Sequence, residues 1–440
     1  MITKTAWKNV WRNRTRSLVV ITAVTIGIFA GVFAVAVMNG AIDQRIDSAI
    51  DNEISHIQIT AKGFRINNDP GSYIDSVENI RERISGLEEV EAVCNRLFVV
   101  GMANTARKST GVKITGIIPE QERDVFKLHE ELVPGTGSYF EQDDNSGLAY
   151  IGFDLAKQLN IIRYEINEKV IEELEESELP EDILQAIDEF SGTRFNNEKH
   201  FQKKMRTALN KEQEEEYGTA IREAAEKIRD RARFILTFVD MDNHQTGGVY
   251  RVGGIYDIPN SMFESQRVFI QENALRDLID FPPDAAHKII IRLYDIDDTE
   301  MISEKLRNMF PGLEVMSWKE IQPDMAMTSE MAEAMYGLFM ALILAALAFG
   351  IVNTMLMVVL ERTKELGMLT AIGMNKKKVF RMIMTESVFL SLTGGVAGMI
   401  VSWIVTTITS RKGINFGSVQ EGFEAMGFSS HIYPEIGLEF

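Results

Sequence analysis

The chain of 440 residues contains only one cysteine, Cys94. A single cysteine cannot form an intrachain disulfide, so any domain outside the cytoplasm must be held together by its hydrophobic core alone. Cys94 lies within EVEAVCNRLFVV, whose β-branched and apolar residues predict a strand. We expect a buried, unreactive thiol there, with a reactive thiol as the alternative.

Motifs for several common chemistries are also missing. The sequence has no G-x-x-x-x-G-K-[ST] run to hold nucleotide phosphates, no H-E-x-x-H pair for a metal and no G-x-S-x-G nucleophile turn. Its six histidines are scattered without the spacing of metal ligands. We therefore predict no catalytic residue, no metal site and no cofactor bound by this chain itself.

Basic residues are fewer than acidic ones. Lys and Arg number 46 against 64 Asp and Glu, which gives a formal net charge of −18. The excess acid lies mostly in residues 41–330. Such a surface repels phosphate backbones, which excludes nucleic acid as a partner and indicates a solvated domain.

Charge is nearly absent from three long apolar runs, at residues 17–38, 334–360 and 383–408. Because a helix rises about 1.5 Å per residue, each run can cross a hydrocarbon core of about 30 Å. The first run could instead be a cleaved signal peptide, but it exceeds the usual apolar core of about 7–15 residues. We predict three transmembrane spans, with the first one retained.

Basic residues cluster at only one side of these spans. Residues 1–16 carry no acid and predict an amphipathic helix on the inner membrane surface. By the positive-inside rule, residues 1–16 and 361–382 lie in the cytoplasm, whereas residues 41–330 lie outside. The residues expected to anchor the chain at the inner surface are Trp7, Arg12, Arg14, Arg16, Lys376, Lys377, Lys378 and Arg381.

The stretch between the second and third spans predicts a short helix. Leu366, Leu369 and Ile372 recur every third residue, and charged residues crowd the first turns. Gly373 stands where a C′ glycine would end the helix. On charge alone, an ordinary loop on the inner side of the membrane would also account for this stretch.

This stretch resembles the ABC-transporter permeases of the FtsX-like superfamily, of the macrolide-exporter and lipoprotein-release type. Their loop reads close to E-R-x-x-E-[IL]-G-x-[LM]-x-A-[IL]-G, and basic residues and a glutamate follow it, here Lys376 and Glu386. In the family the loop is a coupling helix that sits in a groove on an ATPase. The matching positions are Glu361, Arg362, Glu365, Leu366, Gly367, Leu369, Ala371, Ile372 and Gly373.

The resemblance implies a membrane protein with α-helical transmembrane spans and a large extracytoplasmic α+β domain. It places a ferredoxin-like portion in residues 41–330, into which a β-rich portion is inserted at residues 110–280. In agreement with this, strand–helix–strand patterns occur near both ends of residues 41–330.

Two segments depart from the family. Residues 164–232 are dense in Glu, Lys and Arg and predict a charged helical insert, either a solvated elaboration or a docking surface. Residues 409–440 resemble the extracytoplasmic segment that precedes a fourth span, and that span is missing. We expect either truncation or a separate polypeptide that supplies the remainder.

The resemblance also implies the function. The chain would be a permease subunit in the bacterial cytoplasmic (inner) membrane, with ATP and Mg²⁺ bound by a partner ATPase dimer. Further partners would be a second permease subunit, identical or different, membrane lipid, and an extracytoplasmic carrier or accessory protein. Lipoprotein release from the membrane is the function we favour. Efflux of a small molecule or peptide, or mechanical signalling to an extracytoplasmic partner, is the alternative.

Overall fold

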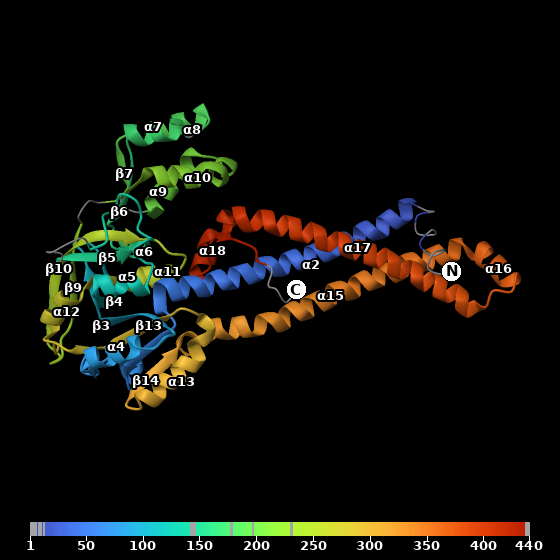
Figure 1. Ribbon diagram of the computed structural model, residues 1–440. Helices are drawn as coiled ribbons and strands as arrows, with labels where there is room; N and C mark the ends of the chain where they lie inside the picture. Colours follow the sequence, from blue (N-terminus) through green and yellow to red (C-terminus); the bar gives the residue numbers. More distant parts are fainter. Residues whose placement is uncertain are drawn as a thin grey trace. The chain divides into compact units, whose positions relative to one another are not determined.

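Figure 1 shows a computed structural model of the protein, which describes residues 7, 11, 14–140, 147–176, 179–195, 198–228 and 232–435. The chain divides into two compact units. The first, here called the helical unit, consists of Met1–Gln44, Asp324–Gly417 and Ser429–Phe440. The second, here called the sheet unit, consists of Arg45–Pro323 and Ser418–Phe428.

Three long helices form most of the helical unit: α2 (Arg14–Ser48), α15 (Pro323–Glu361) and α17 (Lys376–Lys412). All three are long and apolar enough to cross a membrane. Many large apolar side chains of α15 are exposed, as expected where lipid is the solvent. They include Leu338, Leu342, Phe349, Val352, Leu356 and Leu360. The three predicted apolar runs are therefore helical, as expected.

Helices α2 and α17 pack closely because small residues line the contact. A Cβ at Gly394 would lie 2.8 Å from the Cβ of Val24, and one at Gly398 would lie 3.0 Å from the carbonyl oxygen of Thr25. The Thr25 hydroxyl donates to the Gly394 carbonyl at 3.1 Å. Such spacing of small residues is typical of helix contacts in membranes. Close packing is therefore the role of Gly394 and Gly398.

The segment after α17 forms small elements in its described part. Strand β15 (Ile414–Asn415) pairs with β16 (His431–Ile432), and the carbonyl of Tyr433 accepts a hydrogen bond of 3.0 Å from Gln44. Helices η3 (Gly417–Val419) and α18 (Gln420–Ala425) lie between the two strands in sequence.

One end of the nine-stranded sheet in the sheet unit combines four strands and two helices. The strands are β1 (Ile57–Ala61), β3 (Val90–Asn104), β13 (Lys288–Leu293) and β14 (Leu313–Ser317). They lie in the order β14-β1-β13-β3, all antiparallel. Helices α4 (Val77–Ser85) and α13 (Thr299–Met309) bury Ile84, Ile302 and Leu306 in one core with the isoleucines of β1 and β13. The arrangement is compatible with a ferredoxin-like portion.

The remaining five strands close, together with β3, into a ring of six. They are β4 (Ser109–Ile117), β5 (Leu148–Gly152), β9 (Arg233–Val239), β10 (Gln245–Tyr256) and β11 (Arg267–Gln271). The order β3-β4-β11-β5-β10-β9 closes because β9 also pairs with the end of β3. A Cβ at Gly101 would lie 2.4 Å from the carbonyl oxygen of Thr237, so glycine permits this approach. The interior is packed with apolar residues such as Leu97, Val99 and Ile114.

Short elements connect and cover these strands. They are η1 (Ala49–Ile54), α3 (Phe64–Asn67), β2 (Ile74–Asp75), α5 (Pro119–Val125), α6 (Phe153–Gln158), α11 (Ser261–Gln266), α12 (Glu272–Ile279), β12 (Ala285–Ala286), η2 (Ile296–Asp298) and α14 (Trp318–Ile321). Helix α5 covers Cys94, which is a free, fully buried thiol, as predicted. Burial raises its pKa well above the usual value, which keeps the thiol protonated.

Residues 162–228 form a separate small core within the sheet unit (Figure 1, green). Strands β6 (Ile162–Ile166), β7 (Thr193–Phe195) and β8 (Glu226–Ile228) form its sheet. Four helices cover it: α7 (Glu168–Glu176), α8 (Glu181–Asp188), α9 (Glu198–Ala208) and α10 (Lys211–Ala225). The sequence pattern indicated the helices and missed the sheet, whose strands are short and rich in charge. Ile183 and Ile187 belong to this core.

Candidate functional site

The candidate site is centred on α16 (Thr363–Ala371), the short helix between α15 and α17. It ends as its sequence predicts. Gly373 has φ +99°, its N–H donates to the Thr370 carbonyl at 3.1 Å, and the N–H of Met374 donates to the Leu369 carbonyl at 3.0 Å. These two bonds form a Schellman motif, which glycine stabilises because it adopts positive φ without strain. The helix is therefore a defined element with a fixed end.

None of the residues of α16 is buried in the chain. Leu366 and Leu369 are half-buried, whereas Ile372 is 79% exposed and Met368 is 59% exposed. Glu361, Glu365, Gly367 and Ala371 are exposed as well. A short helix that presents both apolar and charged side chains has the character of a surface that another protein covers.

Arg362 joins α16 to the third long helix. Its Nε donates to a carboxylate oxygen of Glu365 at 3.1 Å, and its Nη1 lies 3.5 Å from a carboxylate oxygen of Glu386 in α17. Glu386 is only 7% exposed. A buried carboxylate in an apolar helix is costly unless a cation pairs with it. The sequence marked Glu386 as part of the family pattern, but only the fold reveals its partner.

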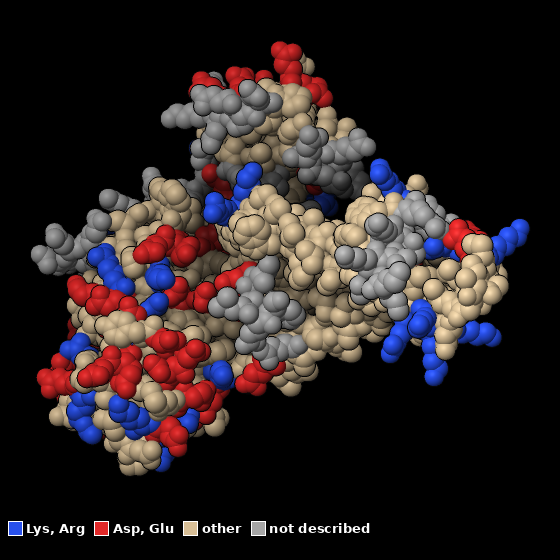
Figure 2. All heavy atoms as spheres, turned by 45° about the vertical axis from the view of Figure 1, so that its right-hand side comes forward, with Lys and Arg blue, Asp and Glu red and all other residues tan. Residues whose placement is uncertain are grey.

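Basic residues surround this end of the helical unit (Figure 2, blue, right). Lys376, Lys377 and Lys378 occupy the first turn of α17 and are exposed, behind an Asn375 cap whose side chain accepts from the Lys377 N–H at 3.0 Å. Lysines at a helix N-terminus oppose the helix dipole, so they do not serve helix stability. They suit an anionic surface instead.

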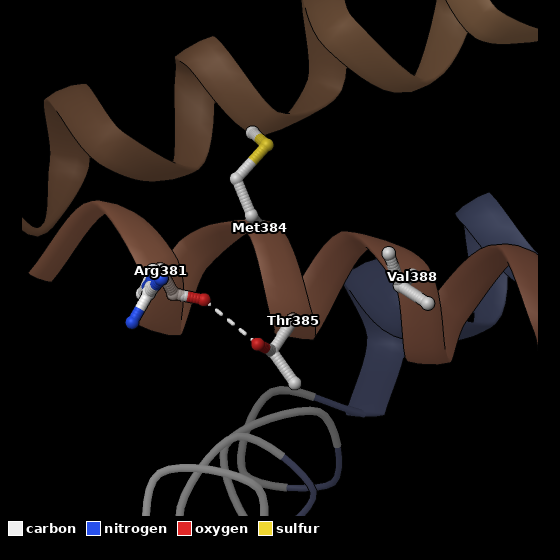
Figure 3. A pocket seen from close by; sticks show the side chains of 4 residues that line it. All are labelled: Arg381, Met384, Thr385 and Val388. Atoms are coloured by element: carbon white, nitrogen blue, oxygen red, sulfur yellow. Dashed lines mark hydrogen bonds between the residues drawn. The ribbon is translucent and has the colours of Figure 1, made fainter. Parts of the chain in front are cut away.

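A hollow on α17 continues this basic region. It is lined by Arg381, Met384, Thr385 and Val388, and the Thr385 hydroxyl donates to the Arg381 carbonyl at 2.8 Å (Figure 3). Its lining is apolar apart from Arg381 and the Thr385 hydroxyl, which is already bonded. The hollow therefore offers contact area and no arrangement of reactive groups.

The predicted N-terminal anchor is described only in part. Trp7 and Trp11 are helical and exposed, and their ring centroids are 6.0 Å apart; the Trp7 ring also lies 5.5 Å from Phe389 of α17. Arg14 begins α2 and is exposed. Arg12 and the side chain of Arg16 lie outside what the structure describes. Exposed tryptophans are typical of a membrane interface.

Metal chemistry finds no support in the described ranges: no group of three or more His, Cys, Asp or Glu side chains there could hold an ion. The arrangement at α16 likewise contains no paired acid and base aimed at a cavity. What it offers is an exposed, capped helix tied by an ion pair to a span-length helix, which is a geometry for contact and movement.

Two protein families match the chain. The family described as FtsX-like permease C-terminal matches residues 337–433, and the MacB-like periplasmic core domain matches residues 17–172. The first match contains α16 and α17, and the second contains the strands β1, β3, β4 and β5. Together the two matches cover more than half of the chain.

Individual relatives match over shorter stretches. The Pyoverdine export ATP-binding/permease protein PvdT of Pseudomonas entomophila (strain L48) is 38% identical over 80 residues, which is 18% of this chain and 12% of that protein. PvdT of Pseudomonas fluorescens (strain Pf0-1) is 32% identical over 130 residues, 28% of this chain and 20% of that protein. The ABC transporter permease YtrF of Bacillus subtilis (strain 168) is 41% identical over 63 residues, 14% of each chain. The chain thus spans no more than a fifth of the length of these relatives.

Two solved structures are similar at low sequence identity. The extracellular domain of the noncanonic ABC-type transporter YknZ from Gram-positive bacteria is 12% identical, with a TM-score of 0.30, and covers 59% of this chain and 98% of that one. The periplasmic region of MacB from Actinobacillus actinomycetemcomitans is 11% identical, with a TM-score of 0.31, and covers 65% of this chain and 97% of that one.

Proposed function

The chain belongs to the FtsX-like ABC-transporter permeases and carries a MacB-like periplasmic core domain, and from this premise we propose that it is a membrane subunit through which a separate ATPase moves an extracytoplasmic domain. The observation that carries the proposal is α16. It is exposed, its C-terminal end is closed by Gly373, and it is joined without a long linker to two span-length helices.

The proposed mechanism is mechanical. Closure of an ATPase dimer would push α16, with Leu366, Leu369 and Ile372 in apolar contact and Glu361, Glu365 and Arg362 setting orientation. The ion pair between Arg362 and Glu386 would pass the displacement to α17 as well as α15. Gly367 and Ala371 are small enough to let a partner surface approach the helix closely. No residue of this chain performs covalent chemistry in this scheme.

The partners follow from the same surfaces. ATP and Mg²⁺ would be bound by the ATPase dimer. The exposed apolar side chains of α15 would face lipid and a second permease subunit in the inner membrane. The basic residues Lys376, Lys377, Lys378 and Arg381, together with Trp7, would hold this end at the anionic inner leaflet.

Two substrate classes are proposed. Lipoprotein release rests on the resemblance of the sequence to permeases of the lipoprotein-release type. Efflux of a small molecule is favoured by the relatives whose names specify pyoverdine export. Purification of the chain with its native partners, followed by mass spectrometry of bound acylated protein or small molecule, decides between them. If the chain instead signals to an extracytoplasmic partner, neither acylated protein nor a small molecule should be found bound to it.

The test of coupling uses substitutions in α16. We expect Leu366→Asp to abolish stimulation of the partner ATPase, because it places an unpaired charge in an apolar contact. Glu365→Lys should weaken stimulation less, since an exposed charge pair contributes only about 0–1 kcal/mol. Lys412→Glu, at the opposite end of α17, is the matched charge-reversal control and should leave stimulation unchanged. Normal stimulation by the Leu366→Asp protein would remove α16 from the mechanism.

A further inference from the structure

Four adjacent strands of the sheet unit bring basic side chains to one face. In the strand register, Lys288 of β13 is opposite Arg96 of β3, and Arg267 of β11 is opposite Lys113 of β4. Lys113 in turn is opposite Val100 of β3, which lies on the same face as Arg96 because side chains alternate along a strand. Neighbouring strands are about 5 Å apart. Lys113, Arg267 and Lys288, here called the basic face, therefore share one face of these four strands, and the charges of Lys113 and Arg267 both act on Lys288.

Like charges placed so close repel one another unless acids neutralise them. In the described part of the chain, Lys113, Arg267 and Lys288 form no ion pair. Two nearby acids are already engaged. Glu122 pairs with the buried Arg96, and Glu53 binds Arg45 at 2.8 Å and the Asn260 amide at 2.8 Å.

A fourth cation adds to this excess of positive charge. Arg65 donates to the carbonyls of Glu320 and Ile321, which carry no charge to neutralise it. The basic face therefore carries uncompensated positive charge within an otherwise strongly acidic chain.

An unsatisfied hydroxyl lies beside these cations. Thr115 is two residues from Lys113 along β4, so both side chains are on the same face. Thr115 is 1% exposed, and its hydroxyl has no hydrogen-bond partner. Such a group costs free energy unless something bonds to it. It lies opposite Phe98, whose ring is 4.9 Å from the ammonium nitrogen of Lys288.

The protonation of Lys288 reflects this setting. Burial, together with the charges of Arg267, Arg96, Arg65 and Lys113, lowers its pKa to about 7. The groups that shift it most are all cations. An anion at the basic face would reverse these effects and restore the full charge of the ammonium group.

We propose that Lys113, Arg267 and Lys288, with the Thr115 hydroxyl, form a binding site for a phosphate-type oxyanion on the outer face of the six-stranded ring. Three cations match the charge of such an anion, and Arg267 can offer two parallel N–H donors. The hydroxyl supplies one further donor, which the fold otherwise leaves unused. The anion could be free phosphate or the phosphomonoester head of a lipid, since the two present the same chemistry. The site needs no ATPase and is independent of the coupling proposed for α16.

The test measures protection of Lys288 in the full chain, held in an uncharged detergent. An amine of low pKa is acylated rapidly by an N-hydroxysuccinimide ester at pH 7.5, and mass spectrometry reports the rate at Lys288 against the exposed Lys108. We expect inorganic phosphate to slow acylation of Lys288 severalfold while Lys108 is unaffected, with chloride at equal ionic strength as reference. Dihexanoyl phosphatidic acid, with dihexanoyl phosphatidylcholine as control, forms a second arm. Much tighter protection by phosphatidic acid than by phosphate identifies a lipid head, and equal protection identifies the free anion.

Substitutions distinguish a specific binding site from general electrostatic attraction of anions to the chain. Arg267→Gln and Lys113→Gln should each weaken protection about tenfold, which corresponds to one charge-assisted hydrogen bond. Lys108→Gln removes the same charge at a distance and should change nothing. Thr115→Val conserves shape, so the unliganded protein should melt at the same or a higher temperature while protection weakens. Absence of protection by both ligands, or equal loss in the Lys108→Gln protein, would overturn the proposal.

Discussion

The ion pair between Arg362 and Glu386 connects the start of α16 to α17. Glu386 is buried, and Arg362 is itself only partly exposed, at 19%. Removing one partner from a buried pair leaves an uncompensated charge and costs about 3–5 kcal/mol, whereas removing both costs much less. While the pair is intact, it therefore holds the start of α16 against α17.

We predict that Arg362→Gln lowers the melting temperature of the purified chain in detergent more than Glu386→Gln does. The first substitution removes the guanidinium that faces the buried Glu386 carboxylate, and the second leaves a cation that can turn toward Glu365. The double substitution should be milder than Arg362→Gln alone. Strictly additive losses in the three proteins would show that the two side chains do not interact.

A second residue, Glu264, makes the stability of the sheet unit depend on pH. It is 3% exposed, and burial followed by the charge of Asp257 raises its pKa to about 9. The folded chain therefore holds this proton at neutral pH, while the unfolded chain has lost it. Because the folded state binds more protons between pH 4.5 and about 9, the free energy of unfolding falls as the pH rises through this window.

Glu264→Gln should remove this dependence. The amide oxygen can still accept the bond that the Ile258 N–H donates at 2.5 Å, and no charge can form. We expect the two proteins to melt alike near pH 5 and the substituted protein to melt higher near pH 9. Parallel melting curves across the range would mean that Glu264 is ionised in the folded state.

Ion pairs between residues far apart in the chain could not be predicted from the sequence. The family pattern singled out Arg362 and Glu386 without linking them, and nothing in the sequence joined Arg96 to Glu122. Helix α5 begins at Pro119 and buries Glu122 against Arg96. A partner across 26 residues depends on strand register, and register follows from the whole sheet rather than from neighbours.

Among the elements, the contact between α2 and α17 depends on glycine. A leucine at position 398 would place its Cβ only 3.0 Å from the carbonyl oxygen of Thr25 and 3.0 Å from the Cβ of Ile28. The two helices would have to separate to make room for it. Overpacking of this kind costs about 1–3 kcal/mol. We predict that Gly398→Leu lowers the melting temperature of the chain in detergent by several degrees.

Gly350 in α15 offers the matched control. Nothing in the chain lies within 4 Å of a Cβ built there. Gly350→Leu should be neutral or slightly stabilising, because leucine favours the helix more than glycine does. Equal destabilisation by both substitutions would indicate that glycine at 398 serves helix flexibility and not packing.

Elements were predictable where the signal is local. The three apolar runs and the helix ending at Gly373 follow from composition and from one glycine. The strand–helix–strand patterns near the two ends of residues 41–330 correspond to β1, α4 and β3 and to β13, α13 and β14. The ring of six strands could not be predicted. Its closure requires β9 to pair with β3 across more than 130 residues, and no short-range pattern encodes such a contact.

At the scale of the whole molecule, residues 162–228 form a small domain within the sheet unit. Their core is separate from that of the six-stranded ring, and their apolar stripe at Ile183 and Ile187 packs inside it. Ile162 of β6 pairs with Ile228 of β8, so the two ends of the segment lie side by side. Ile162 and Ala232 both belong to the core of the ring, which marks where the segment leaves it.

Because its ends meet, this segment should be removable. We predict that a short Gly/Ser linker from Ile162 to Ala232 leaves a folded chain whose main thermal transition moves little, since the cost of closing a loop changes by only about 0.6 kcal/mol per doubling of its length. Ile187→Asp provides an independent comparison: it should unfold the segment alone, as a charge buried in its core has no partner. Loss of the main cooperative transition in both proteins would show that the segment and the ring fold as one unit. An intact transition combined with lost transport in cells would instead assign the segment to the docking of a partner.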